Sequence, residues 1–176
     1  MENNLSIVKD KFKELPNNIE AEQSVIGSIL ISNEIFDDIN TIIKSNNFYD
    51  PMHMRVFDAI EKLIYSGMLA NPITLKNYFD SDEDKINIPE YLVKITKFSS
   101  STRQAIEYAK LIYDLYVKRE LIKISENIID TAKLNDLDNN GQKIIETSER
   151  ALFDLAERGS FNSSLVKFDS ALKMTI

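Results

Sequence analysis

The stretch from residue 103 to residue 134 constrains the fold of this sequence most. It contains no glycine and no proline, and its apolar residues recur at three- and four-residue spacing. They form more than one stripe: Ile106, Ala109, Tyr113 and Tyr116; Tyr108, Ile112, Leu115, Ile122 and Ile129; and Val117, Leu121, Ile124 and Ile128. A helix that is apolar around so much of its circumference must bury two faces. The stretch therefore predicts a long helix with two partners.

One partner is predicted by the segment that follows. Residues 142–158 form a second helical pattern, and the turn N-D-L-D-N-N-G separates it from the first. Two helices joined by so short a turn predict an antiparallel hairpin over residues 102–158. The face left over needs a partner outside the hairpin, and a paired hairpin from a second subunit is the simplest one. The candidate subunit-interface residues are Tyr113, Tyr116 and Ile124.

A compact helical unit is predicted before the hairpin, over residues 16–98. Its first helix starts at Asn18, a favourable capping residue, and Glu20 and Glu22 lie where a helix N-terminus favours negative charge. Gly27 interrupts the apolar face of this helix at a cost of about 1 kcal/mol, which predicts a close-packed neighbour. Residues 1–15 are predicted to be a mobile arm outside the unit.

Local signals predict four more helices in this unit. Asn33 is expected to cap a helix that reaches Ile43, and Asp50 followed by Pro51 starts one that stops at Gly67. Short helices are expected at residues 74–79 and 89–98, with an acidic loop at residues 80–84 between them. After Gly159 a polar linker is expected over residues 159–176, with the start of a further helix that the sequence leaves unfinished. The predicted fold class is all-α.

Composition narrows the possible functions. The net charge is −7 and the pI is about 4.8, so the chain is a poor candidate for tight nucleic acid binding by itself, since proteins that grip phosphates normally have a basic face. Lys118, Arg119 and Lys123 are expected to be solvated helix surface. Cysteine is absent, the N-terminus has no secretory signal and no stretch is apolar enough to span a membrane. A cytoplasmic protein is expected.

The sequence also lacks the residues for several chemistries. Its glycines are at positions 27, 67, 141 and 159, and none is followed by lysine, so no phosphate-binding P-loop is present. His53, the single histidine, cannot form a multi-histidine metal site and is expected to bond a nearby carboxylate or carbonyl. The acidic loop lacks the pattern of a calcium site. We expect no catalytic, cofactor or metal site, and aromatic residues that pack in the core.

Several segments, in this order, resemble the N-terminal domain of bacterial replicative DNA helicases, the DnaB family. I-E-A-E-Q-S-V-I-G-S-I-L (residues 19–30) is similar to its opening helix, and F-Y-D-P-M-H-M-R-V-F-D-A-I (48–60) to its second signature. P-I-T-L (72–75) and the residues from Tyr91 to Ile122 resemble later helices. The resemblance covers residues 16–158 and continues more weakly to the end. Ile88-Pro89-Glu90 departs from it, since the family often has paired glycines there.

The resemblance implies a module that builds the collar of a helicase ring as a trimer of dimers and receives primase on its hairpin. The residues expected to dock primase are Ile122, Ile128 and Ile144, although the same three could close the hairpin against itself. The resemblance also places ATP, magnesium and DNA unwinding in a motor domain outside this chain. A freestanding helical adaptor, such as the helicase-binding domain of a primase, and a small enzyme of unknown type are the alternatives.

Overall fold

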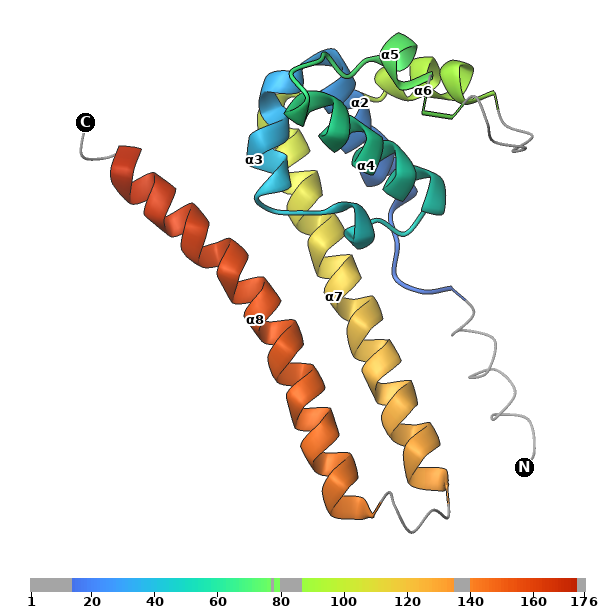
Figure 1. Ribbon diagram of the computed structural model, residues 1–176, viewed down its shortest axis with the longest axis vertical. Helices are drawn as coiled ribbons and strands as arrows, with labels where there is room; N and C mark the ends of the chain where they lie inside the picture. Colours follow the sequence, from blue (N-terminus) through green and yellow to red (C-terminus); the bar gives the residue numbers. More distant parts are fainter. Residues whose placement is uncertain (1–13, 77, 80–86, 135–139, 174–176) are drawn as a thin grey trace, which may run out of the picture.

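The computed structural model describes residues 14–76, 78–79, 87–134 and 140–173, of which residues 158–173 are described as backbone alone. All regular structure in these residues is helical (Figure 1). The globular unit contains α2 (Ile19–Ile31), α3 (Phe36–Asn40), α4 (Pro51–Tyr65), α5 (Pro72–Lys76) and α6 (Ile88–Thr96). The long helix α7 (Thr102–Lys133) starts in this unit and extends away from it, and α8 (Gly141–Lys173) returns beside it. The predicted all-α fold with a terminal helical hairpin is confirmed.

Helix α2 is the centre of the globular unit and packs against α4, α6 and α7. Asn18 caps it as predicted, since its side-chain oxygen accepts a hydrogen bond from the Ala21 amide at 2.9 Å. Gly27 lies against the end of α6, where a Cβ would clash with the carbonyl oxygen of Ile95. The predicted close neighbour of Gly27 is therefore confirmed, and because it is backbone it cannot rotate away.

The helix predicted from Asn33 to Ile43 is shorter than expected. The chain first forms a 3₁₀ turn at residues 33–35, and α3 ends at Asn40. Asn33 does not cap it: its amide nitrogen donates to the Ile29 and Ala70 carbonyls, and its oxygen accepts from the Ala70 amide. The side chain thus ties the end of α2 to the segment after α4, and this distant contact replaces the predicted local one.

Helix α4 carries the aromatic centre of the core. Asp50 caps it, Pro51 is its first residue, and Gly67 adopts a φ of +76° just beyond its end, all as predicted. The fully buried ring of Phe57 lies 5.6 Å from the ring centroid of Phe36 and 5.0 Å from that of Phe48. These distances are within the range of favourable aromatic pairs.

The two short helices differ from prediction by a few residues at each end. Helix α5 begins two residues earlier than expected because the Asn71 side chain accepts hydrogen bonds from the amides of Ile73 and Thr74. It ends at Lys76 rather than Phe79. Helix α6 is capped by Asn87 and ends at Thr96. The predicted acidic loop at residues 80–84, and the predicted arm except for residues 14 and 15, lie outside the described residues.

A chain of buried polar side chains joins α2, α4 and α6. Glu22 accepts hydrogen bonds from the Tyr49 amide at 2.6 Å and the Asp50 amide at 3.3 Å, and it lies 2.6 Å from His53 Nδ1. His53 Nε2 lies 2.7 Å from the Tyr91 hydroxyl, which also accepts from Gln23. Burial raises the pKa of the Tyr91 phenol, and the bond from Gln23 opposes this. His53 therefore has a carboxylate partner as expected, but this partner is 31 positions away on α2 and not a local residue.

The hairpin helices begin as predicted, but α8 does not end as predicted. Ser101 caps α7 with a capping box, and α7 continues to Lys133. Helix α8 continues through Gly159 to Lys173, where the sequence predicts a linker. The cost of one interior glycine, about 1 kcal/mol, is too small to end a long helix by itself. No helix in the described part of the chain is long and apolar enough to cross a bilayer.

Candidate protein-interaction surface

Helix α7 has two halves with different surroundings. In the first half, Ala105, Ala109 and Ile112 are buried in the core that α2 and α3 share. Tyr116 is also buried, and its ring lies 6.1 Å from that of half-buried Tyr113. The chain's own globular unit thus covers part of the apolar circumference that the sequence assigns to a second subunit. Little of Tyr113 and Tyr116 is left for a partner, and their interface role stays a prediction.

The second half of α7 faces α8. Ile124 and Ile128 line a cavity of about 220 Å³ between the two helices, opposite Thr147, Ser148 and Ala151. Ile144 is half-buried on α8, one turn before these residues. Ile124 and Ile128 therefore face α8, and their roles in a subunit interface and in primase docking stay predictions.

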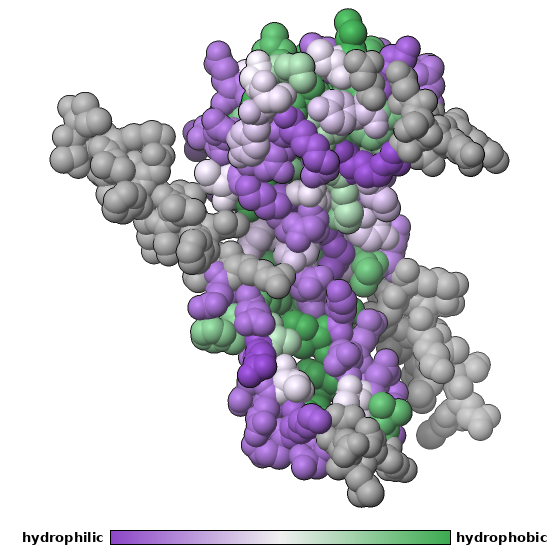
Figure 2. Space-filling model, viewed as in Figure 1, coloured by the Kyte–Doolittle hydropathy of each residue, from purple (hydrophilic) through white to green (hydrophobic). Residues whose placement is uncertain are grey.

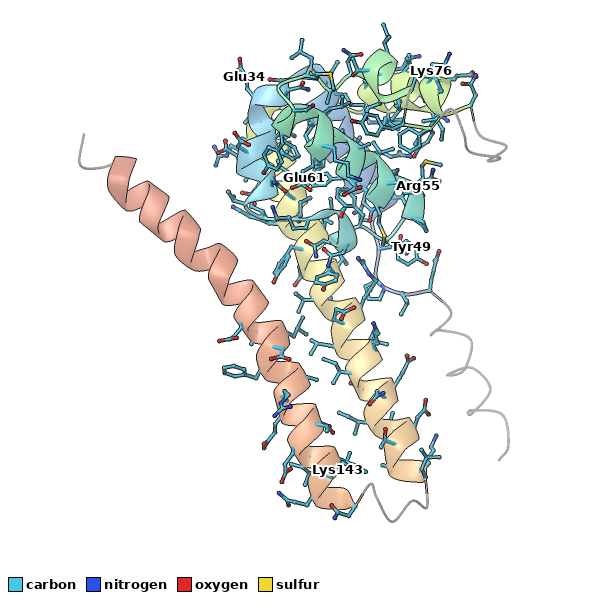
Figure 3. All side chains as sticks on the ribbon, viewed as in Figure 1. Glu34, Tyr49, Arg55, Glu61, Lys76 and Lys143 are labelled. Carbon is cyan, nitrogen blue, oxygen red and sulfur yellow. The ribbon has the colours of Figure 1, made fainter. Side chains whose placement is uncertain are left out.

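Ile122 lies on a different side of α7. It lines a groove of about 390 Å³ between α7 and the rim of the globular unit, together with Tyr49, Met54 and Tyr116. Figure 3 places Tyr49 at this rim, beside the segment that enters α2. The structure therefore does not bring Ile122 together with Ile128, although both are candidate primase contacts.

Arg119 fixes the point where α7 leaves the globular unit. Its Nη1 donates to the Pro16 carbonyl at 2.8 Å and its Nη2 to the Asn47 carbonyl at 2.6 Å. Its guanidinium carbon lies 5.6 Å from the centre of the Tyr49 ring, and burial lowers its pKa. The expectation of solvated surface is wrong for Arg119. The position of Arg119 between the apolar residues Tyr116 and Ile122 is the sequence signal that could have indicated its burial.

A set of large apolar side chains stays exposed on the hairpin. Phe153 is 61 % exposed and Ile129 is 51 % exposed, although both belong to apolar stripes of their helices. Figure 2 shows apolar surface between polar side chains along this part of the molecule. The exposed set comprises Leu121, Ile129, Leu134, Ile145, Leu152 and Phe153. This set, which we call the exposed hairpin set, is the candidate interaction surface, and the sequence pattern alone did not separate it from the buried residues.

The described residues contain no group of three or more His, Asp or Glu residues able to hold a metal ion. The Glu22–His53–Tyr91 chain is the one place where an acid, an imidazole and a hydroxyl meet in this part of the protein. His53 and Glu22 are almost completely buried there and their polar atoms bond one another and the backbone, so the chain is structural.

The comparison with family models decides which group of proteins this architecture represents. Residues 14–114 match the model described as the DnaB-like helicase N terminal domain. The chain belongs to this family. Its fold agrees with the crystal structure of the N-terminal domain of DnaB helicase from Mycobacterium tuberculosis. The TM-score is 0.73, the match covers 80 % of this chain and 99 % of that chain, and the sequences are 22 % identical.

Curated relatives of this DnaB-family domain are replicative DNA helicases. The replicative DNA helicase DnaB of Rickettsia conorii is 34 % identical over 164 residues, which cover 92 % of this chain and 33 % of the relative. That of Rickettsia typhi is 38 % identical over 147 residues, or 82 % of this chain and 30 % of the relative. The chain therefore spans about a third of the length of the curated relatives it matches. The resemblance found in the sequence is confirmed.

Proposed function

We propose that this DnaB-family domain is the collar module of a replicative helicase, which assembles with copies of itself and receives primase. The observation that carries the proposal is the exposed hairpin set, in which Ile129 is 51 % exposed and Phe153 is 61 % exposed although both belong to apolar stripes of the two long helices. Exposed apolar patches on otherwise polar surfaces commonly mark protein interfaces. In the complete protein, ATP, magnesium and DNA would be handled by a motor domain outside this chain.

Self-association is tested by light scattering of the 176-residue chain. The wild-type chain is expected to form dimers, and Ile129→Glu and Phe153→Glu are expected to shift it toward the monomer without loss of helix content. Ile73→Glu is the matched control, since Ile73 is 82 % exposed on α5 of the globular unit. A wild-type chain that stays monomeric at high concentration would contradict the proposal.

Primase docking is tested by calorimetric titration with the C-terminal domain of the cognate primase. Ile122→Asn changes the groove beside the globular unit, and Ile144→Ala changes α8 within the hairpin. Hydrophobic anchors near the centre of an interface often account for about 2 kcal/mol or more of binding free energy. Weaker binding with an unchanged melting temperature supports docking at that residue. If Ile128→Ala lowers the melting temperature and the affinity together, Ile128 contributes to hairpin stability and not to contact.

The absence of a P-loop predicts that this chain neither binds nor hydrolyses ATP. Equilibrium dialysis with ATP and magnesium measures the binding, and a coupled assay measures hydrolysis. Stoichiometric ATP binding that survives purification would contradict the proposal that a motor domain outside this chain handles ATP.

A further inference from the structure

The groove between α7 and the globular unit has a floor and walls suited to an apolar segment. Buried Phe48 and Tyr116 form its floor, and half-buried Met54 and Ile122 form its walls. Its volume of about 390 Å³ lies within the range of sites that bind ligands or side chains. Glu120 and Glu126 of α7 also line it, together with Arg119 and Lys123, so its charged residues carry both signs.

The N-terminal segment of the chain is anchored at this groove. Leu15 lines it, and the next residue, Pro16, accepts the hydrogen bond from Arg119 at 2.8 Å. Phe12 precedes Leu15 by three residues, a span of about 10 Å at most. Residues 1–13 are thus tethered at the groove, and a tether raises the local concentration of an attached segment into the millimolar range.

The sequence of this segment complements the groove. Leu5, Val8, Phe12 and Leu15 follow one another at three- and four-residue spacing, which places them on one face if the segment turns as a helix. Lys9 and Lys11 flank that face on its two sides, whereas Asp10 lies opposite. The apolar stripe suits the apolar part of the groove, and Glu120 and Glu126 of its lining are the acidic partners available to Lys9 and Lys11.

We propose that residues 5–13 of this chain bind in the groove between α7 and the globular unit, with Phe12 as the apolar anchor. The bound segment covers Ile122 and Met54 and ties the hairpin to the globular unit at the level of Arg119. This inference does not depend on self-association, because all of its parts lie in this chain, but it competes with primase docking at Ile122, which the bound segment covers.

Limited trypsin digestion tests the proposal through cleavage after Lys9, Lys11 and Lys13. Ile122→Asp should raise the cleavage rate about tenfold, because cleavage of a segment that opens and closes rapidly follows the population of its open form. Leu121→Asp is the matched control, since Leu121 neighbours Ile122 on α7 but does not line the groove. Neither substitution changes the sequence at the cleavage sites. Met54→Asp, on the opposite wall, gives a second test if Ile122→Asp lowers helix content.

The proposal is overturned if the wild-type segment is cleaved as fast as in both groove variants. It is also overturned if Leu121→Asp accelerates cleavage as much as Ile122→Asp, because protection would then come from chain association.

A spin label shows whether the segment binds its own chain. The sequence contains no cysteine, so Lys11→Cys creates a single labelling site. Broadening of amide signals at residues 48–54 and 119–126 of the labelled chain supports the proposal. Broadening that appears only in unlabelled chains mixed with labelled ones would assign the groove to the arm of a second copy and overturn it. Phe12→Asp should abolish the broadening, whereas Ile7→Asp, away from the apolar face, should preserve it.

Discussion

The globular unit and the hairpin have similar residue types but bury them very differently. In the globular unit Phe36, Phe48 and Phe57 are fully inaccessible to solvent and lie in contact with one another. In the hairpin, Leu155 is the one buried apolar residue among the described side chains of α8, and Phe153 is 61 % exposed.

The difference follows from the number of elements that meet. Five helices and the start of α7 surround one core, so the core residues are covered from several sides. Two antiparallel helices bury only the stripes that face each other. The globular unit therefore has an enclosed core, although Leu69 and Ile73 are exposed on its surface, whereas the second half of the hairpin has no such core.

The same type of substitution in the two regions should give the largest contrast. Phe57→Ala removes a buried ring from the core and should lower the free energy of unfolding by about 3–5 kcal/mol. Phe153→Ala should change it by no more than about 0.5 kcal/mol in the monomer, because the ring is exposed. Urea denaturation at a concentration where the chain is monomeric measures both. Equal losses would show that the hairpin is packed as tightly as the globular unit.

Removal of the buried carboxylate should be the next largest effect. Glu22→Ala leaves His53 and the amides of Tyr49 and Asp50 without their acceptor. Unsatisfied buried groups predict a loss of about 3 kcal/mol in the free energy of unfolding. Glu20→Ala, at an exposed position of the same helix turn, should cost at most about 1 kcal/mol. Urea denaturation curves with similar losses for both variants would contradict the structural role of the polar chain.

Replacing glycine by alanine compares Gly27, which lies against the backbone of α6, with Gly141, which has open space around it. Gly27→Ala should lower the free energy of unfolding by about 1–3 kcal/mol, because the added methyl meets the Ile95 carbonyl at the end of α6. Gly141→Ala, at the open start of α8, has no heavy atom within 4 Å of the new Cβ and should change stability by less than about 1 kcal/mol. Thermal melting monitored by circular dichroism separates the two. A Gly27→Ala variant as stable as the wild type would mean that α6 moves aside easily.

The smallest expected effect is a dependence on alkaline pH. Burial raises the pKa of Tyr91 in the folded chain, so the folded state holds the phenol proton more tightly than the unfolded state. Its contribution to stability is complete below the ordinary tyrosine pKa of 10.0 and is lost as the pH rises through the folded pKa. The stability of the wild-type chain should therefore fall more steeply above pH 10 than that of Tyr91→Phe. Urea midpoints measured at successive pH values give the two slopes, and parallel slopes would refute the effect.

Much of the fold could be predicted because its signals are local. Asn18, Asp50 with Pro51, and Gly67 mark helix ends at the positions that the structure confirms. Two of the failures occurred where a residue contacts a distant segment instead of its neighbours. Asn33 bonds Ala70, and Arg119 bonds the carbonyl of Pro16, 103 positions away. The candidate surface could be located on the hairpin, but the sequence did not distinguish Ile124, which faces α8, from exposed Ile129.

The sequence by itself determined that this protein is helical, where most helices start, and that its longest helix has more apolar surface than one partner covers. These properties depend on interactions within about four residues, which spacing and capping residues report directly. Only the tertiary structure decided how that apolar surface is divided between the globular unit, α8 and solvent. It also decided that Glu22 and His53 meet across 31 positions, since the partner of a buried polar group depends on which helices pack together.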